Sequence, residues 1–261
     1  MHSDVYFATG KIHSACQDYA FAAEIKGQPF IVLADGCSSS PHTDVGARIL
    51  AHRLISDLRK GVVKNTSPDQ QQLLSVVSSG QCVVEMLSLP PACMDATLLF
   101  TTFLNDGIAL AHVVGDGVVA SLKKSGAIYM MSFECPAGAP EYVNYLTDAK
   151  RHEKFLREFG SKRILRTSIL QPDGAVEVIE ELAFEAMLYS RCFTIPDSKV
   201  LALFSDGIRT FHGLKTEQVV RELMAFKNLK GSFVQRRMKR FLKTCETEHD
   251  DDVAMAAICL D

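Results

Sequence analysis

Residues 200–208 have the sequence VLALFSDGI, an apolar run that ends in Ser, Asp206 and Gly. Residues 30–38, FIVLADGCS, repeat the pattern far away in the chain, with Asp35 and Gly directly after an apolar run. Asp-Gly is a common turn dipeptide, so either pair alone would be explained by a simple chain reversal. Two apolar strands that end in the same dipeptide indicate that both Asp-Gly pairs serve the same purpose. The ends of strands can bring distant parts of a chain together at one rim of a sheet.

Two helices are expected after the first Asp-Gly pair. The stretch 43–61 carries apolar residues near one face and ends in a glycine, which is placed to terminate the helix. The second helix is expected to begin with Ser67 as N-cap, Pro68 at its first position and Asp69 in its first turn. It should end before the proline pair at 90–91, because proline disrupts a helix interior.

The middle of the chain is rich in β-branched and aromatic residues and is expected to form strands. They lie within residues 96–104, 108–115, 118–124 and 127–133. The dipeptides Asp106-Gly and Asp116-Gly between them predict a meander of hairpins. Residues 134–198 mix proline, glycine and charge with short helical pieces, such as residues 149–160, and are expected to be less regular. The remaining expected elements are a strand within 199–207, helices at about 216–226 and 231–245, and a final strand at 253–260.

The order of these elements indicates the fold class. Strands, two helices, a strand meander, two helices and a final strand do not alternate as β-α-β units, which favours α+β over a doubly wound parallel sheet. We expect a four-layer α/β/β/α sandwich, in which two antiparallel sheets are flanked by helix pairs. Its 261 residues contain no internal repeat and no low-complexity linker, so one domain over residues 1–261 is expected.

Composition excludes several classes of protein. The net charge of −3 and the isoelectric point of about 6.2 give no electrostatic reason to expect a nucleic-acid partner. The apolar runs are too short to cross a bilayer, and the first residues lack the basic start and apolar stretch of an export signal. The eight cysteines are scattered without Cys-x-x-Cys pairs, so we expect reduced thiols, most of them acting as small hydrophobic residues. A cytoplasmic protein without a membrane partner is therefore predicted.

Several familiar catalytic motifs are absent from the sequence, which leaves carboxylates. There is no phosphate-binding glycine loop, no His-Glu-x-x-His and no Gly-x-Ser-x-Gly. The stretch CSSSPHT at 37–43 is similar to a cysteine-phosphatase loop, but a threonine stands where that loop needs an arginine. Asp35, Asp206 and the triplet 250–252 each adjoin an expected buried strand.

Carboxylates that meet at one rim repel each other unless a divalent cation neutralises them. A site made only of oxygen ligands suits Mg²⁺ or Mn²⁺ rather than zinc. The glycine after Asp35 and after Asp206 lets the backbone approach closely, so that a carbonyl can also become a ligand. The sequence therefore predicts a divalent metal site built on strand ends.

Five segments, in order, resemble the metal-dependent protein serine/threonine phosphatases of type 2C, and more closely their compact bacterial branch. They are GKIHSACQDYAF from residue 10, VLADGCSSS from 32, ATLLFTTFLNDGIALAHVVGDG from 96, LALFSDGI from 201 and DDVAMAAI from 251. The resemblance implies an α/β/β/α sandwich that uses Mg²⁺ or Mn²⁺ to hydrolyse phosphoserine and phosphothreonine in proteins, opposing a serine/threonine kinase. It also implies that residues 134–198 contain the variable flap-like segment of the family.

The resemblance further implies a role for each matched residue. Asp35 would bridge two metal ions, and the carbonyl of Gly36 would complete one coordination shell. Asp206 would hold one ion and Asp251 the other. A water between the two ions would become hydroxide-like and attack phosphorus in line.

Four further positions matter, and two of them depart from the family pattern. Asp18 would act through metal-bound water, and Asp116 falls where the family has an accessory ligand for a third metal, although a plain hairpin turn explains Asp116 equally well. His13 replaces a phosphate-binding arginine of the animal enzymes, and we expect it to face the phosphate as a catalytic residue beside Asp35. Cys37 replaces a histidine that is a candidate general acid, which leaves that role open between His13 and His42.

Two other functions stay open. A catalytically silent, phosphatase-like binding module would be indicated by loss of a core metal carboxylate, and Asp35, Asp206 and Asp251 are all present. A related hydrolase of small phosphoesters would share the metal site, so only substrate profiling would distinguish it.

The basic stretch 230–243 is the other feature that would suit an anion or a membrane surface. Val234, Met238 and Phe241 form an apolar stripe at helical spacing between its charges. We therefore expect a helix that packs on the sandwich and keeps a solvated basic face.

Overall fold

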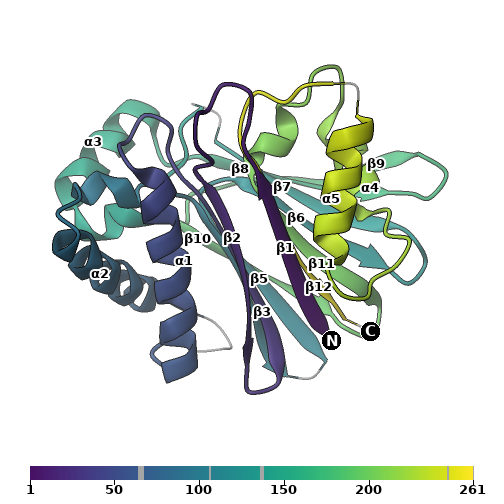
Figure 1. The fold of residues 1–261 in the computed structure, drawn as a ribbon, viewed down its shortest axis with the longest axis horizontal. Helices are drawn as coiled ribbons and strands as arrows, with labels where there is room; N and C mark the ends of the chain where they lie inside the picture. The colour runs from purple at the N-terminus through teal and green to yellow at the C-terminus, as the bar shows by residue number, and fades with distance from the viewer. Residues whose placement is uncertain (64–67, 106, 136–137, 246, 261) are drawn as a thin grey trace.

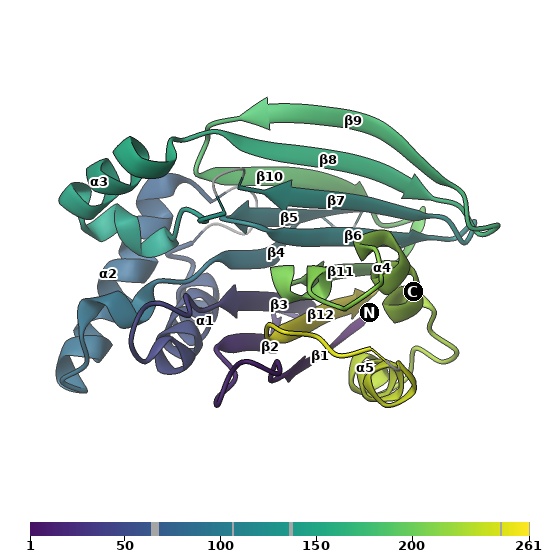
Figure 2. The same ribbon diagram turned by 90° about the horizontal axis from the view of Figure 1, so that it is seen from above.

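The computed structural model describes residues 1–63, 68–105, 107–135, 138–245 and 247–260, and it consists of two stacked sheets with helices outside them (Figure 1). The larger sheet has the order β1 (His2–Ala8), β12 (Val253–Cys259), β11 (Ser198–Phe204), β6 (Gly117–Lys123), β7 (Ile128–Glu134), β8 (Arg163–Leu170) and β9 (Val176–Phe184). The smaller sheet has the order β10 (Leu188–Thr194), β5 (Ile108–Val114), β4 (Leu98–Asn105), β3 (Gln28–Asp35) and β2 (Asp18–Ile25). Each of these neighbouring pairs is antiparallel, which Figure 2 shows from above.

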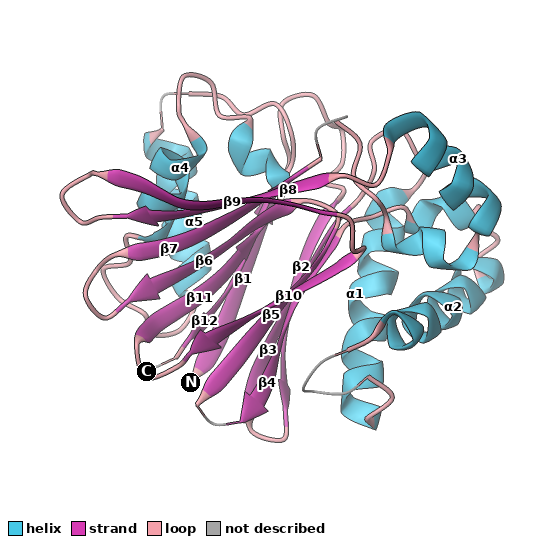
Figure 3. Ribbon diagram, turned by 180° about the vertical axis from the view of Figure 1, so that it is seen from behind, coloured by secondary structure: helices cyan, strands magenta, loops and turns pink. Residues whose placement is uncertain are grey.

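Helices cover both outer faces of the sandwich (Figure 3). On the smaller sheet α1 (Thr43–Lys60) packs on β2 and β3, and α2 (Gln70–Met86) packs on α1. On the larger sheet α5 (Phe233–Thr244) packs on β1 and β12, and α4 (Thr216–Met224) packs on α5. The remaining helical pieces are η1 (Pro91–Met94), η2 (Val143–Thr147), α3 (Ala149–Phe159) and η3 (Asp206–Arg209). The expected four-layer α/β/β/α sandwich is confirmed.

The helix ends follow capping chemistry. Gly61 ends α1 with a left-handed backbone (φ 73°), as its position after the apolar stripe predicted. Helix α2 begins with Asp69 as its N-cap, which accepts a 2.8 Å hydrogen bond from the Gln72 backbone N–H, while the Gln72 side chain accepts from the Asp69 N–H at 3.2 Å. Ser67, the expected N-cap, lies outside the described residues. The structure has Asp69 as the N-cap of this helix.

The apolar residues form two cores, one on each side of the larger sheet. The first lies between the two sheets and under α1 and α2, and includes Phe30 and Phe100. The second lies between the larger sheet and helices α4 and α5. Val234, Met238 and Phe241 of α5 are buried in it, which confirms that the basic stretch packs one apolar face on the sandwich. Burying a large apolar side chain stabilises a fold by about 1.5–3 kcal/mol, so α5 is firmly attached.

The expected hairpin at Asp116 is wrong. Strand β5 before it belongs to the smaller sheet and β6 after it belongs to the larger sheet, so the two strands are not partners. Gly115 and Gly117, with φ of 88° and 129°, allow the chain to cross from one sheet to the other around Asp116. The turn dipeptide was correctly recognised, but turn chemistry alone does not say whether the next strand pairs with the last one. The expected turn at Asp106 lies outside the described residues.

Two other expectations differ from the structure. The helical piece expected within residues 134–198 is confirmed as α3, but the segment is more regular than expected, because it also contains three strands. Strands β8 and β9 extend the larger sheet, and β10 borders the smaller one. All eight cysteines are free thiols, but only Cys93 and Cys259 are buried, while Cys82 and Cys192 are exposed. None of the described helices is long and apolar enough to span a membrane.

Candidate metal centre

The topology gathers carboxylates at one end of the sandwich. Asp18 is the first residue of β2 and pairs directly with Asp35, the last residue of β3. Asp206 follows β11 and opens η3, and Asp251 stands just before β12, the antiparallel neighbour of β11. Asp116 lies where the chain crosses between the sheets. Five acidic residues that are far apart in sequence therefore meet at one rim.

Asp35 occupies the middle of this group. Its carboxyl lies within hydrogen-bond reach of the carboxyls of both Asp18 and Asp206. Burial raises the pKa of Asp35 well above its ordinary value, and the charges of Asp18, Asp206 and Asp116 raise it further. Burial also raises the pKa of Asp18, although a hydrogen bond from the Ser205 hydroxyl opposes that rise. The raised pKa values favour the protonated carboxyls in the absence of a cation, because like charges taken out of water repel each other.

Asp116 is buried and has a cationic neighbour that the sequence did not reveal. Burial and the charge of Asp206 raise its pKa to about 7, against the opposing effect of Arg209. The Arg209 guanidinium lies 3.5 Å from Asp116 Oδ2 and donates to the backbone carbonyls of Phe133 at 2.6 Å and Gly117 at 3.3 Å. Arg209 follows the Asp206 motif by only three residues, but nothing in its local sequence points to Asp116.

Asp251 and His13 lie beside each other at the edge of the group. Burial and the charge of Asp206 raise the pKa of Asp251. His13 Nδ1 is 3.5 Å from Asp251 Oδ1 and 3.0 Å from Asp252 Oδ2, and its Nε2 is 3.3 Å from the Ser38 hydroxyl. His13 therefore stands between the acidic segment before β12 and the loop after Asp35, and its role in facing a phosphate stays a prediction.

The three consecutive aspartates 250–252 have three different environments. Asp252 is buried and accepts hydrogen bonds from the backbone N–H groups of Gly10 at 2.7 Å and Gln17 at 2.6 Å, which ties the N-terminal loop to β12. Asp250 is more exposed and pairs with His212 at 2.8 Å. Burial and the charge of Asp206 raise the pKa of Asp251, and the role of Asp251 as a metal ligand stays a prediction.

The glycines after the two strand-end aspartates serve close backbone packing. A Cβ on Gly207 would lie 1.7 Å from the carbonyl oxygen of Asp252, and one on Gly36 would lie 2.8 Å from the Thr43 Cβ. Neither site would accept a larger residue without moving a neighbouring segment. The sequence inference that these glycines permit close approach is confirmed, and a ligand role for the Gly36 carbonyl stays a prediction.

Asp95 makes several hydrogen bonds that hold the loop after Asp35, and no sequence pattern pointed to this role. The carboxylate of Asp95 accepts a 2.7 Å hydrogen bond from Ser40 and two bonds from Arg151 of α3, at 3.0 and 2.6 Å. Its backbone carbonyl accepts from the Cys37 N–H at 2.9 Å. Asp95 therefore fixes the position of the loop relative to α3.

Cys37 and the two candidate general acids, His13 and His42, have different surroundings in the structure. Burial acts to raise the pKa of the Cys37 thiol, but hydrogen bonds from Ser39, Tyr142 and Ser40 outweigh it and lower that pKa overall. His42 is exposed and opens α1 with a left-handed backbone (φ 58°). His13 is the histidine with contacts to the acidic group.

The residues of this group fit a divalent cation. In the part of the chain that the structure describes, no three His, Cys, Asp or Glu side chains form a ready-made metal site. The available donors are nevertheless all carboxylates, and Asp18 Oδ2 and Asp116 Oδ1 are buried without a hydrogen-bond partner. Oxygen ligands of this kind suit Mg²⁺ or Mn²⁺, and a cation would replace the protons that the group otherwise needs.

Comparison with protein families identifies the family of the chain. The family described as Protein phosphatase 2C matches residues 11–251, which include the proposed ligands from Asp18 to Asp251. The chain belongs to the protein phosphatase 2C family. The resemblance indicated by the sequence motifs is thereby confirmed. No curated protein matches the chain.

Solved structures share the fold over nearly the whole of both chains. A bacterial serine phosphatase is 12% identical with a TM-score of 0.60, and 99% of this chain and 97% of that chain are covered. A serine/threonine phosphatase from Staphylococcus aureus is 13% identical with a TM-score of 0.57, at coverages of 99% and 94%. A chain from work on the bacterial stressosome is 16% identical with a TM-score of 0.53, at coverages of 98% and 97%. At these identities the likeness concerns the fold.

Proposed function

We propose that the protein is a Mg²⁺- or Mn²⁺-dependent phosphatase that hydrolyses phosphoserine and phosphothreonine in proteins. The observation that carries the proposal is the position of Asp35, whose half-buried carboxyl lies within hydrogen-bond reach of Asp18 and Asp206. Such a cluster is costly in a fold without cations and becomes favourable around them. Bound divalent ions would supply positive charge for the phosphate and would make an attacking water more acidic.

Four residues of the chain would hold the metal ions. Asp35 would be a ligand shared by two ions, and the Gly36 carbonyl would add a neutral ligand to one of them. Asp206 and Asp251 would each hold one of these ions. No covalent phosphoenzyme is needed, because water is the nucleophile in a binuclear hydrolysis.

The outer residues would act on the water and the substrate. Asp18 would orient metal-bound water rather than bind an ion directly. Asp116 would bind an accessory third ion, in competition with the Arg209 guanidinium beside it. His13 would face the phosphate and either steady it or protonate the leaving oxygen, since its Nδ1 already lies against Asp252.

The cellular setting follows from family membership and composition. The substrate would be a phosphorylated protein, and the enzyme would oppose a serine/threonine kinase in the cytoplasm. Residues 134–198 would act as the variable flap beside the centre, which the contact between Arg151 of α3 and Asp95 supports. The structural likeness to a stressosome-related chain favours a role in regulation rather than in metabolism.

The test is hydrolysis of p-nitrophenyl phosphate and of phosphoserine and phosphothreonine peptides with Mn²⁺, with and without chelator. We expect activity that requires the metal, is lost in Asp206→Ala, and persists in Asp173→Ala, which changes an exposed turn aspartate. Turnover of small phosphoesters without peptides would favour the small-substrate hydrolase. Mn²⁺ binding without any turnover would favour the silent binding module.

A further inference from the structure

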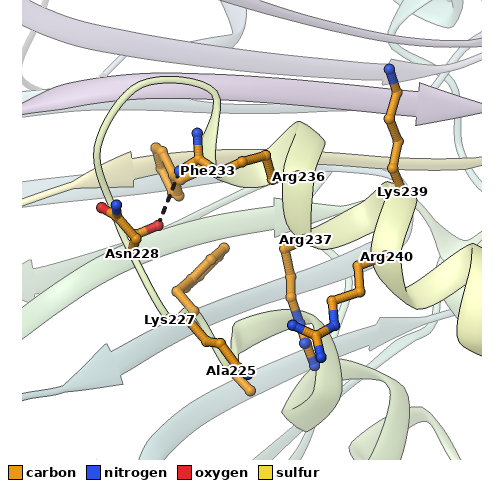
Figure 4. Close-up of a pocket in the computed structure, with 9 residues that line it drawn as sticks. Ala225, Lys227, Asn228, Phe233, Arg236, Arg237, Lys239 and Arg240 are labelled. Carbon is orange, nitrogen blue, oxygen red and sulfur yellow. Dashed lines mark hydrogen bonds between the residues drawn. The ribbon is translucent and has the colours of Figure 1, made fainter.

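A pocket distant from the carboxylates lies between the α4–α5 connection and α5, with a volume of about 470 Å³ (Figure 4). Its lining combines aromatic and basic residues. The residues are Ala225, Phe226, Lys227, Asn228, Phe233, Arg236, Arg237, Lys239 and Arg240. The connection and the first turns of α5 thus form a concavity on the outside of the larger sheet.

The apolar part of the pocket is built from two packed rings. Phe226 and Phe233 meet edge to face with ring centroids 5.2 Å apart. Phe233 is buried, whereas Phe226 keeps part of its surface accessible. The ring of His2 also meets Phe233 edge to face, with ring centroids 5.3 Å apart, so β1 contributes to the support of this aromatic wall. An apolar side chain would fit against such a rigid wall.

The rim of the pocket is basic, and part of that charge is uncompensated. Arg236 donates to the backbone carbonyls of Asn228 and Lys230, and Arg237 pairs with Glu222 at 2.7 Å. By contrast, the side-chain cations of Lys227 and Arg240 make no hydrogen bond or ion pair with any residue in the described ranges.

Arg237 and Arg240 extend to the same side of α5 in Figure 4, as residues three apart on a helix do. Glu222 compensates the Arg237 guanidinium, which leaves the positive charge of Arg240 beside it without an anionic partner in the described residues.

The charge and the shape of the pocket together indicate which kind of ligand would bind there. The chain as a whole carries a net charge of −3, so a local basic rim is complementary to a short acidic segment rather than to an extended polyanion. A concave pocket with an aromatic wall requires a side chain that can enter, which a flat lipid surface or a nucleic-acid backbone does not offer. We propose that this pocket docks an acidic peptide segment of a protein partner, with an apolar side chain on Phe226 and carboxylates on Lys227 and Arg240.

The docking pocket is separate from the candidate metal centre. His2, at the start of β1, contacts Phe233 of the pocket, whereas Gly10, just after β1, is bonded to Asp252 beside the centre. The seven residues of β1 rise by about 3.3 Å each, so the two sites lie roughly 20 Å apart along the strand. The inference therefore does not rest on the proposed function, and its test does not require turnover.

Fluorescence anisotropy with a labelled short peptide tests the proposal. The peptide would carry several Glu and Asp residues around a Leu-Phe pair, and a matched peptide would have Ser in place of Leu and Phe. We expect saturable binding that weakens at least about ten-fold in Lys227→Glu/Arg240→Glu, the change for two lost charge contacts. The matched control Lys154→Glu/Lys243→Glu, which changes exposed lysines outside the pocket, should bind like the wild type.

Several results would overturn the docking site. They are absence of saturable binding, equal weakening by the two double variants, equal binding of the Ser-substituted peptide, and tighter binding to heparin or to phosphatidylglycerol vesicles. Thermal unfolding of the pocket variant should match the wild type, because both altered side chains are exposed. If the pocket variant unfolds early, the single variant Lys227→Glu gives the same comparison with a smaller expected loss.

Discussion

Replacing Asp116 by asparagine should stabilise the metal-free protein, although it removes a site carboxylate. Burial and the charge of Asp206 raise the Asp116 pKa from 3.8 to about 7. At about 1.36 kcal/mol per unit of pKa, ionised Asp116 costs the folded state about 4 kcal/mol. Because the folded-state pKa exceeds the unfolded value, the folded state binds the Asp116 proton more tightly. The stability that this proton contributes is fully present below pH 3.8 and is lost as the pH rises through about 7.

The variant Asp116→Asn does not titrate, but it also loses the contact with Arg209. We therefore expect its metal-free form to be more stable than the wild type at pH 8 by about 3 kcal/mol, or about 6 °C in Tm. Thermal unfolding followed by circular dichroism in chelator measures the difference. The advantage should fall by more than half at pH 5, since most of the wild-type Asp116 is then protonated in the folded state.

Two controls make this prediction specific. Asp173→Asn, in the exposed turn between β8 and β9, should leave Tm unchanged at both pH values. Added Mn²⁺ should raise the Tm of the wild type more than that of Asp116→Asn, because the variant has lost a ligand. A variant that is equally or less stable than the wild type in chelator at pH 8 would refute the claim that the buried carboxylates need a cation.

Three further substitutions test the supporting structure. Gly207→Ala places a Cβ 1.7 Å from the Asp252 carbonyl oxygen and should lower the unfolding free energy by about 3 kcal/mol or more, and an unchanged urea midpoint would count against the close packing. Asp252→Ala leaves the N–H groups of Gly10 and Gln17 without their acceptor and should lower the free energy of unfolding, measured in urea, by about 3 kcal/mol. The N-terminal loop should then be cleaved faster by a protease. His13→Ala should lower kcat on p-nitrophenyl phosphate and leave Mn²⁺ affinity nearly unchanged, so a parallel loss of affinity would assign His13 to the metal site instead.

The strands and most helices were predictable because their apolar patterns are local. Runs such as 30–34 and 200–204 are apolar throughout, and they became fully buried strands. Strand β9 escaped notice because its side chains are largely exposed and it contains an irregularity in register opposite Thr167 and Ser168. An edge strand of this kind lacks the alternating burial that makes strands recognisable.

Only those residues of the candidate site that stand in a recognisable local sequence pattern could be predicted. Asp35 and Asp206 were found because each ends an apolar strand, and the structure brings them into contact. Arg209 and Asp95 were missed because their partners, Asp116 and Arg151, lie far away in the sequence. Such pairings depend on the meeting of separate strands and helices, which no local pattern records.

Calorimetric titration of Mn²⁺ into the metal-free protein is the most direct test of the central claim, which is that the carboxylates around Asp35 form a divalent metal centre. We expect saturable binding of at least two ions by the wild type and loss of the tighter ions in Asp35→Ala, with proton release as the buried carboxyls ionise. Asp173→Ala should bind like the wild type. Absence of saturable binding, or equal binding by Asp35→Ala, would contradict the account.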